Sequence, residues 1–188
     1  MIPALWTSPP LTAEESARWT TSEERAAAAG FVSERRRAEF LTWRAVVRRE
    51  LGDDVGIAYD ALGAPVLTNR AVHISVAHCA GRIAVCASPE RCAVDIEPAT
   101  RDFRRAASRY LTPEEEALSD DPLLPGIVWC AKETLYKYAG CRELDFRRDL
   151  HVVRLDLAAG TLAGRIGNGE PLRLSVSLDE GFILVYIL

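Results

Sequence analysis

The sequence lacks the usual signs of an exported, membrane-spanning or disulfide-linked protein. Its five cysteines are odd in number and contain no C-x-x-C pair, so neither a disulfide framework nor a zinc site is predicted. No apolar run is long enough to span a bilayer, and the opening residues lack a basic leader. We therefore expect a cytoplasmic protein with reduced thiols and no membrane partner.

The sequence also lacks the excess of positive charge that is typical of nucleic-acid binding. The formal net charge is −4, whereas a protein that holds phosphate backbones usually presents a basic surface. The chain has 188 residues, of which 48% are apolar, which is enough for a substantial core in one domain or two packed halves. We expect a globular monomer with no nucleic-acid partner.

The most informative stretch of the chain predicts a helix over about residues 126–139, ended by Gly140. At 3.6 residues per turn, one stripe of this helix is apolar and a second stripe is functional. The second stripe consists of Trp129, Lys132, Glu133, Tyr136 and Lys137. On its own, the pattern is more typical of an exposed helix stabilised by a Glu133–Lys137 pair, which contributes about 0.2–0.5 kcal/mol.

A second long helix is predicted from Ser33, its N-cap, to Leu51. Its outer face is rich in arginine and contains Arg35, Arg36, Arg37, Arg44, Arg48 and Arg49. Alternating apolar residues and turn signals predict strands at about residues 72–77, 82–87, 91–97, 151–157, 162–166, 172–178 and 182–188.

The chain contains an internal repeat: residues 74–85 align without gaps with residues 174–185. Each copy is a strand, a turn that ends in Gly and a second strand, and each follows a long amphipathic helix. The predicted fold class is therefore α+β, a pseudodimer of two similar halves, each with a long helix packed on an antiparallel sheet. We place the halves at residues 1–98 and 99–188, with the active site in the cleft between them.

Three carboxylates are predicted to face one site. In a strand, Asp95 and Glu97 point to the same side while Val94 and Ile96 point to the other, and Pro98 ends the strand there. A D-x-E pair at a strand end is also typical of a solvated edge. Glu133, flanked by lysines on its helix, favours instead an octahedral Mg²⁺ site with positions left for phosphate oxygens.

These motifs resemble, in order and spacing, those of the 4′-phosphopantetheinyl transferases of the monomeric, pseudodimeric type. The resemblance rests on residues 63–65, 74–79, 93–97 and 129–137. It implies two α+β halves that enclose coenzyme A, with Mg²⁺, or alternatively Mn²⁺, at the pyrophosphate. It also implies holo-acyl-carrier-protein synthase activity, in which a serine of an acyl or peptidyl carrier protein attacks the phosphate that bears the pantetheine and 3′,5′-ADP leaves.

The resemblance also implies roles for individual residues. Asp95, Glu97 and Glu133 become the metal ligands, with Glu133 also a candidate base toward the serine, and Lys137 holds the pyrophosphate. The implied coenzyme-binding residues are Arg35, Gly63, Pro65, His78, Cys79, Lys132 and Lys137, with Arg35 and His78 near the 3′-phosphate. Because the carrier proteins are typically acidic, a basic helical face is a candidate docking surface, and it consists of Arg101, Arg104, Arg105 and Arg109.

The sequence departs from the family pattern at three positions. Ala64 stands where the family usually has Lys, and Ala77 and Cys79 stand where it has Ser, which removes a cation and two hydroxyl donors. These changes leave open a non-catalytic relative that binds coenzyme A or a carrier protein. A metal-dependent nuclease is a further alternative, and fatty acid, polyketide and nonribosomal peptide pathways all stay open.

Overall fold

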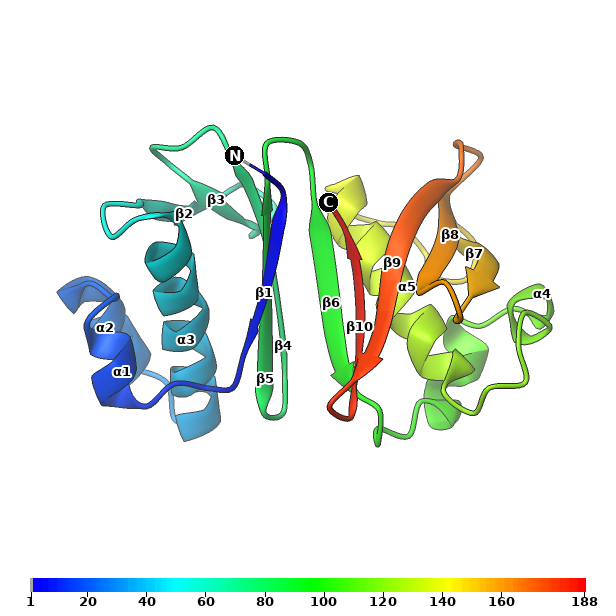
Figure 1. Cartoon of the computed structure of the whole chain (residues 1–188), viewed down its shortest axis with the longest axis horizontal. Helices are drawn as coiled ribbons and strands as arrows, with labels where there is room; N and C mark the ends of the chain where they lie inside the picture. The colour runs from blue at the N-terminus through cyan, green and yellow to red at the C-terminus, as the bar shows by residue number, and fades with distance from the viewer. Residues whose placement is uncertain (1) are drawn as a thin grey trace. The chain divides into compact units, whose positions relative to one another are not determined.

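The computed structural model describes residues 2–188, which form two compact units, one ending at Arg91 and the other running from Cys92 to Leu188 (Figure 1). Each unit combines helices with an antiparallel sheet, so the predicted α+β class is confirmed. The predicted division lay after Pro98, whereas the two units divide after Arg91. The strand Ala93–Pro98 belongs to the second unit because it pairs with the last strand of the chain. We call these parts the first and the second unit.

The first unit is built on a three-stranded antiparallel sheet against which the helix α3 (Glu34–Leu51) packs. Its core joins Trp43, Val46 and Val47 of α3 to Ile83 and Val85 of the sheet. Two short helices pack against α3, and a separate hairpin completes the unit. In chain order the other elements are β1 (Ala4–Ser8), α1 (Ala13–Ala17), α2 (Ser22–Ala29), β2 (Ile57–Tyr59), β3 (Pro65–Leu67), β4 (His73–Cys79) and β5 (Arg82–Ser88).

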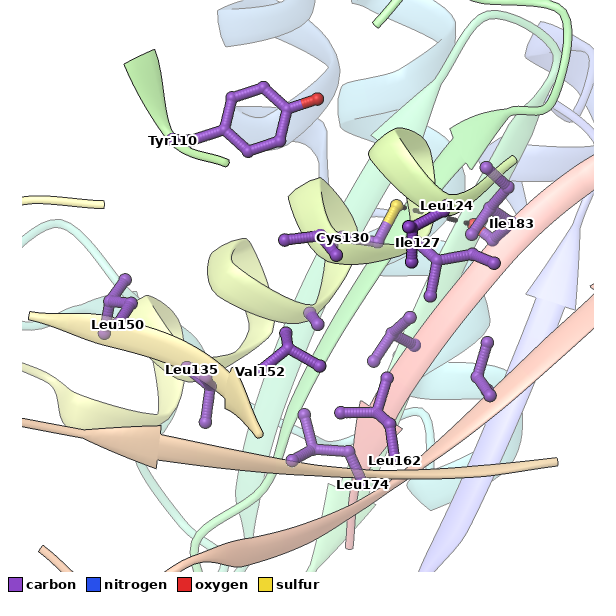
Figure 2. Close-up of a cluster of buried hydrophobic side chains, with 14 of the residues drawn as sticks. Tyr110, Leu124, Ile127, Cys130, Leu135, Leu150, Val152, Leu162, Leu174 and Ile183 are labelled. Carbon is purple, nitrogen blue, oxygen red and sulfur yellow. Dashed lines mark hydrogen bonds between the residues drawn. The ribbon is translucent and has the colours of Figure 1, made fainter. Parts of the chain in front are cut away.

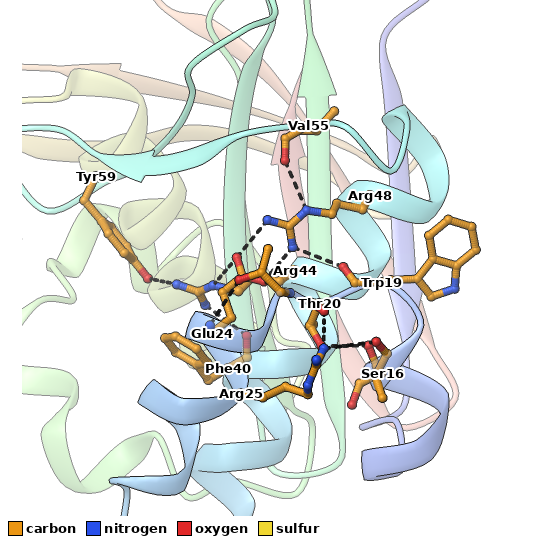
Figure 3. Close-up of polar contacts among 12 residues, drawn as sticks. Ser16, Trp19, Thr20, Glu24, Arg25, Phe40, Arg44, Arg48, Val55 and Tyr59 are labelled. Carbon is orange, nitrogen blue, oxygen red and sulfur yellow. Dashed lines mark hydrogen bonds and ion pairs between the residues drawn. The ribbon is translucent and has the colours of Figure 1, made fainter.

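Two of the arginines assigned to the outer face of α3 are buried, which corrects that prediction (Figure 3). Arg48 forms two hydrogen bonds with the carboxylate of Glu24 on α2, and it also donates to the carbonyl of Val55. The guanidinium of Arg44 lies 3.4 Å from the ring centroid of Phe40 and donates to the hydroxyl of Tyr59. The helix α2 thus supplies the anion that allows two arginines to be buried.

The second unit is a five-stranded antiparallel sheet with the helix α5 (Leu124–Ala139) packed on it. Across the sheet the strands are β6 (Ala93–Pro98), β10 (Phe182–Ile187), β9 (Leu172–Asp179), β8 (Thr161–Ile166) and β7 (Leu150–Asp156). Two short helices, η1 (Arg104–Arg109) and α4 (Pro113–Glu116), precede α5. Figure 2 shows the core that joins α5 to the sheet, including Ile127 and Leu135 from the helix and Leu162, Leu174 and Ile183 from the strands.

The same strand arrangement recurs in the two units. The hairpin β4–β5 corresponds in the repeat to β9–β10, and its turn glycines, Gly81 and Gly181, both have positive φ, at 89° and 81°. In each unit an earlier strand pairs with the second hairpin strand, so that Trp6 lies opposite Val85 and Asp95 lies opposite Val185. This recurrence favours the predicted duplication, and it puts Trp6 at the position where the second unit has Asp95.

The helix α5 has the predicted extent and the predicted apolar stripe. One lysine that was predicted on its functional stripe is buried instead. Lys132 is 0% exposed, and its ammonium lies 2.8 Å from a carboxylate oxygen of Glu115 on α4. It also donates to the backbone carbonyls of Tyr110 and Phe146. The prediction that Lys132 contacts the coenzyme is therefore wrong, because its ammonium is enclosed by protein acceptors. In residues 2–188 no helix is both long and apolar enough to cross a membrane.

Glu115 is the partner on which this buried lysine depends. Its carboxylate also accepts hydrogen bonds from the backbone N–H groups of Thr112 and Val152, so it ties α4 to β7 as well. Glutamine at this position keeps the side-chain volume but leaves a buried ammonium without an anion. Such unpaired burial of a charge costs about 3–5 kcal/mol.

We predict that Glu115→Gln lowers the free energy of unfolding by about 3–5 kcal/mol, because Lys132 then lacks its counter-ion. Denaturant unfolding followed by circular dichroism measures this change. The matched control is Glu116→Gln, which removes an exposed carboxylate from the same helix and leaves the stability near that of the wild type. Equal stabilities for the two variants would contradict the structural role of Glu115.

Candidate active site

The predicted carboxylates lie on two neighbouring elements of the second unit. Asp95 and Glu97 are on β6, and Glu133 is on α5, which packs against β6. Val94, Asp95 and Ile96 are all buried, with Asp95 only 7% exposed, so exposure does not alternate along the strand and its first carboxylate lies deep in the protein. The three groups are therefore carried by a packed helix and by β6, an edge strand that pairs with β10.

Lys137 connects the end of α5 to β6. Its ammonium donates to Asp95 Oδ1 at 2.8 Å and to the backbone carbonyl of Val94 at 2.9 Å. The side chain lies one helical turn after Glu133 and is partly exposed. A cation is thus held beside the carboxylates.

Arg101 pairs with Glu97 at the end of β6. Its guanidinium also lies over two aromatic rings, 5.0 Å from the centroid of Phe103 and 5.4 Å from that of Trp129. The prediction that Arg101 shares a helical face with Arg104 is wrong, because η1 begins only at Arg104. Arg101 therefore belongs to the carboxylate site.

Two of the carboxylates are held in surroundings that disfavour their charge. Burial raises the pKa of Glu133, and the nearby charge of Asp95 raises it further, while Lys137 opposes both effects. Burial likewise raises the pKa of Glu97, where Arg101 lowers it and Asp95 again raises it. The negative charges of the site therefore exceed what its own cations compensate.

The site also contains buried polar atoms without partners of ordinary geometry among residues 2–188: Asp95 Oδ2 and the indole nitrogen of Trp129. Burial and the charges of Arg101 and Asp95 have the larger effects on the pKa of Glu97. The Trp129 N–H is nevertheless close enough to lower this pKa as well. Three oxygen donors, excess negative charge and an unpaired buried oxygen fit a hard divalent cation such as Mg²⁺. Within residues 2–188, however, no three His, Cys, Asp or Glu side chains are already grouped as a metal site.

In the first unit, Arg35 and His78 are brought together by a residue that the sequence did not reveal. Glu39 of α3 is 4% exposed, and its carboxylate lies 3.4 Å from Arg35 Nε and 3.3 Å from His78 Nδ1. Cys79 is buried, and it points to the opposite face of β4 from His78. The structure thus groups Arg35 with His78 and leaves the Cys79 side chain apart from them.

The loop that carries Gly63 and leads into Pro65 of β3 is also fixed by an unpredicted carboxylate. Asp60 Oδ1 accepts hydrogen bonds from the backbone N–H groups of Leu62 and Ala64, at 2.8 and 2.9 Å. The loop joins β2 to β3 and leaves Ala64 exposed. An aspartate that precedes a turn by two residues is a recognised signal for such a loop. Asp60 therefore could have been predicted to fix this loop from the sequence.

Three of the four arginines proposed for docking lie on or beside η1. Arg104, Arg105 and Arg109 are exposed. Arg104 also lines a surface hollow of about 440 Å³ together with Asp120 and Asp121. This part of the second unit presents charges of both signs rather than a purely basic face.

Comparison with known families assigns the chain to one of them. The profile of the 4′-phosphopantetheinyl transferase superfamily matches residues 91–184, half of the chain. The chain belongs to this superfamily. No curated protein matches the chain.

The match to the phosphopantetheinyl transferases covers the whole carboxylate site, namely Asp95, Glu97, Arg101, Glu133 and Lys137. It therefore supports phosphopantetheine transfer in general. The residues predicted for the coenzyme in the first unit, Arg35, Gly63, Pro65 and His78, lie outside the matched segment.

We predict that Glu133→Gln, studied without metal, is at least as stable as the wild type. The folded state raises the pKa of Glu133, so ionisation of this group opposes folding. The stability of the wild type falls as pH rises through the carboxylate range, and the variant lacks this loss. The two proteins should therefore melt alike in acid, diverge as pH rises from the ordinary carboxylate pKa to the raised pKa, and keep a constant difference above it.

Thermal melts in EDTA at several pH values measure this difference. Glu170→Gln, at an exposed position, is the control and should follow the wild type throughout. A Glu133→Gln protein that melts below the wild type at neutral pH would contradict the assigned electrostatics.

Proposed function

We propose that this phosphopantetheinyl transferase moves the 4′-phosphopantetheine group of coenzyme A onto a serine hydroxyl of an acyl or peptidyl carrier protein. The observation that carries the proposal is the arrangement of Asp95, Glu97, Glu133 and Lys137 on β6 and α5, inside the segment that matches the family. The serine oxygen forms a bond to the phosphorus that bears the pantetheine. The bond from that phosphorus to the departing 3′,5′-ADP breaks, and the hydroxyl proton passes to a base.

The carboxylates of Asp95, Glu97 and Glu133 would hold the divalent cation. When bound, Mg²⁺ would polarise the phosphate oxygens and offset the charge that develops on the leaving group. Asp95 Oδ2 supports this assignment, because it forms no hydrogen bond of ordinary geometry and the nearby Cys130 thiol is only a weak donor to the Asp95 carboxylate, so a cation would stabilise this buried oxygen. Burial is the main cause of the raised pKa values of Glu97 and Glu133, and the charge of Asp95 adds to both.

Glu133 is the candidate acceptor of the serine proton. An ordinary carboxylate is a weak base toward a hydroxyl, and a raised pKa brings it closer to the value that general-base catalysis favours. Burial and the charge of Asp95 raise the pKa of Glu133 in this way. A carboxylate oxygen of Glu133 would take the proton as the serine attacks.

Lys137 would position the phosphates. Its ammonium is fixed by Asp95 and by the carbonyl of Val94, which together use two of its three protons as hydrogen-bond donors. The third N–H is available to a phosphate oxygen. An ammonium that is already oriented gains more from such a bond than a freely moving one.

The 3′-phosphate of the coenzyme is assigned to Arg35 and His78. A phosphate with about two negative charges needs cations or oriented donors, and charge-assisted hydrogen bonds contribute about 1.5–3 kcal/mol each. The side chains of Arg35 and His78 are 68% and 50% exposed, and both are oriented by the buried carboxylate of Glu39. Exposed Arg104, Arg105 and Arg109 remain the proposed contacts of an acidic carrier protein.

Departures from the family pattern keep a second candidate function in view. Ala64, Ala77 and Cys79 remove a cation and two hydroxyl donors that the family usually has, which favours a relative that binds its ligand without catalysis. The intact carboxylate site weighs against that alternative. The family match likewise weighs against a nuclease.

We predict that the purified protein adds the mass of phosphopantetheine to an apo carrier protein in the presence of coenzyme A and Mg²⁺. Asp95→Asn and Glu133→Gln should each lower the rate at least about 10²-fold, because each removes an anionic ligand at the developing charge. Mass spectrometry of the carrier protein measures the product. Glu170→Gln is the matched control, since it removes an exposed carboxylate of the same unit.

Two outcomes would contradict this account. If Glu133→Gln turned over near the wild-type rate at saturating Mg²⁺, the metal assignment would be wrong. If the wild type bound coenzyme A but modified no carrier protein from any of the three pathway classes, the non-catalytic relative would be the better description.

A further inference from the structure

The two ordered cations of the carboxylate site already pair with two of the carboxylates that a metal ion would use. Lys137 donates a hydrogen bond to Asp95 Oδ1, and Arg101 forms an ion pair with Glu97. These pairs differ in what else holds the cation. Lys137 is also fixed by a backbone carbonyl, whereas Arg101 is 46% exposed along its side chain and otherwise lies over the rings of Phe103 and Trp129.

The aromatic contacts give Arg101 a place to remain after its ion pair with Glu97 is broken. A guanidinium over an aromatic face is held by the ring quadrupole and does not need the carboxylate. Glu97 is less exposed than Arg101, at 17% for the side chain, so its charge is costly unless a cation is next to it. One cation can therefore replace another at Glu97 while Arg101 stays on its aromatic support.

We propose that Arg101 is a built-in competitor for the metal ion, pairing with Glu97 in the metal-free protein and releasing it when a divalent cation binds. This inference rests on the proposed metal site and adds a residue that sets its affinity. In this role Arg101 compensates the charge of Glu97 in the metal-free protein and weakens metal binding. Arg101 is therefore assigned to the metal site and not to the docking face.

The direct test is a titration of the protein with Mn²⁺ alone, without coenzyme or carrier protein. Because breaking a partly exposed ion pair opposes metal binding, Arg101→Met should bind Mn²⁺ about 3- to 10-fold more tightly than the wild type. Methionine keeps an apolar chain against Phe103 and Trp129. Free Mn²⁺ measured by electron paramagnetic resonance gives the dissociation constants.

Two further variants separate this role from general electrostatics. Arg104→Met removes a nearby exposed arginine that has no ion pair with Glu97, and it should leave the affinity close to that of the wild type. Arg101→Lys retains a competing cation and should restore most of the wild-type affinity. In a diamagnetic Mg²⁺ titration, the Nε–Hε resonance of Arg101 should also shift from its ion-paired to its free position.

Each other result would overturn the proposal. Equal affinities for the wild type and Arg101→Met would show that Arg101 does not compete, and the metal site would stand without it. Weaker binding by Arg101→Met would show that Arg101 instead orients Glu97 as a ligand. If neither protein bound Mn²⁺, or if Asp95→Asn bound it as tightly as the wild type, the metal site of the proposed function would fail together with the proposal.

Discussion

The second unit depends on two ammonium groups that leave the same helix in different directions. Lys132 and Lys137 are the only lysines of the chain, and both are on α5. Lys132 is buried against Glu115 and ties the helix to α4, whereas Lys137 reaches Asp95 and ties the helix to β6. One lysine thus holds the helix in place, and the other holds a cation at the carboxylates.

This division of roles explains why the carboxylate site can tolerate its own charge. Asp95, Glu97 and Glu133 repel one another in partly buried surroundings, and only Lys137 and Arg101 among the described residues form ion pairs with Asp95 or Glu97. The remaining excess is electrostatic strain that a divalent cation would relieve. A site of this kind is less stable empty than loaded, which couples metal binding to the stability of the unit.

Much of the fold followed from local pattern. Gly140 and the apolar stripe of α5 predicted the helix, and the Gly81 and Gly181 turns predicted both hairpins, because these signals act within a few residues. The unit boundary was misplaced because β6 pairs with β10, a partner about ninety residues later in the chain, and no local signal marks such a pairing. The recurrence of strand register in β1 and β6 likewise became visible only once the strands were paired.

The same limit applies to the site. Asp95, Glu97, Glu133 and Lys137 were recognised from residue type and spacing, and the structure brings Lys137 to Asp95. Helical periodicity also put Lys132 on the functional stripe, and it put Arg44 and Arg48 on an outer face. All three are buried, because Glu115 and Glu24 reach them from other elements and compensate their charge. Glu39 was missed as a site residue, and Arg101 was assigned to the docking face instead of the carboxylates, for the same reason: their partners are set by tertiary contacts.

The most direct test of the central claim is the position of a bound metal ion. Crystals grown with Mn²⁺ and coenzyme A, measured at the manganese absorption edge, would show it as an anomalous difference peak. We predict one peak coordinated by carboxylate oxygens of Asp95, Glu97 and Glu133, with Arg101 no longer paired to Glu97. A coenzyme-bound crystal in which Mn²⁺ lies elsewhere, with Asp95 and Glu97 still paired to Lys137 and Arg101, would contradict the account.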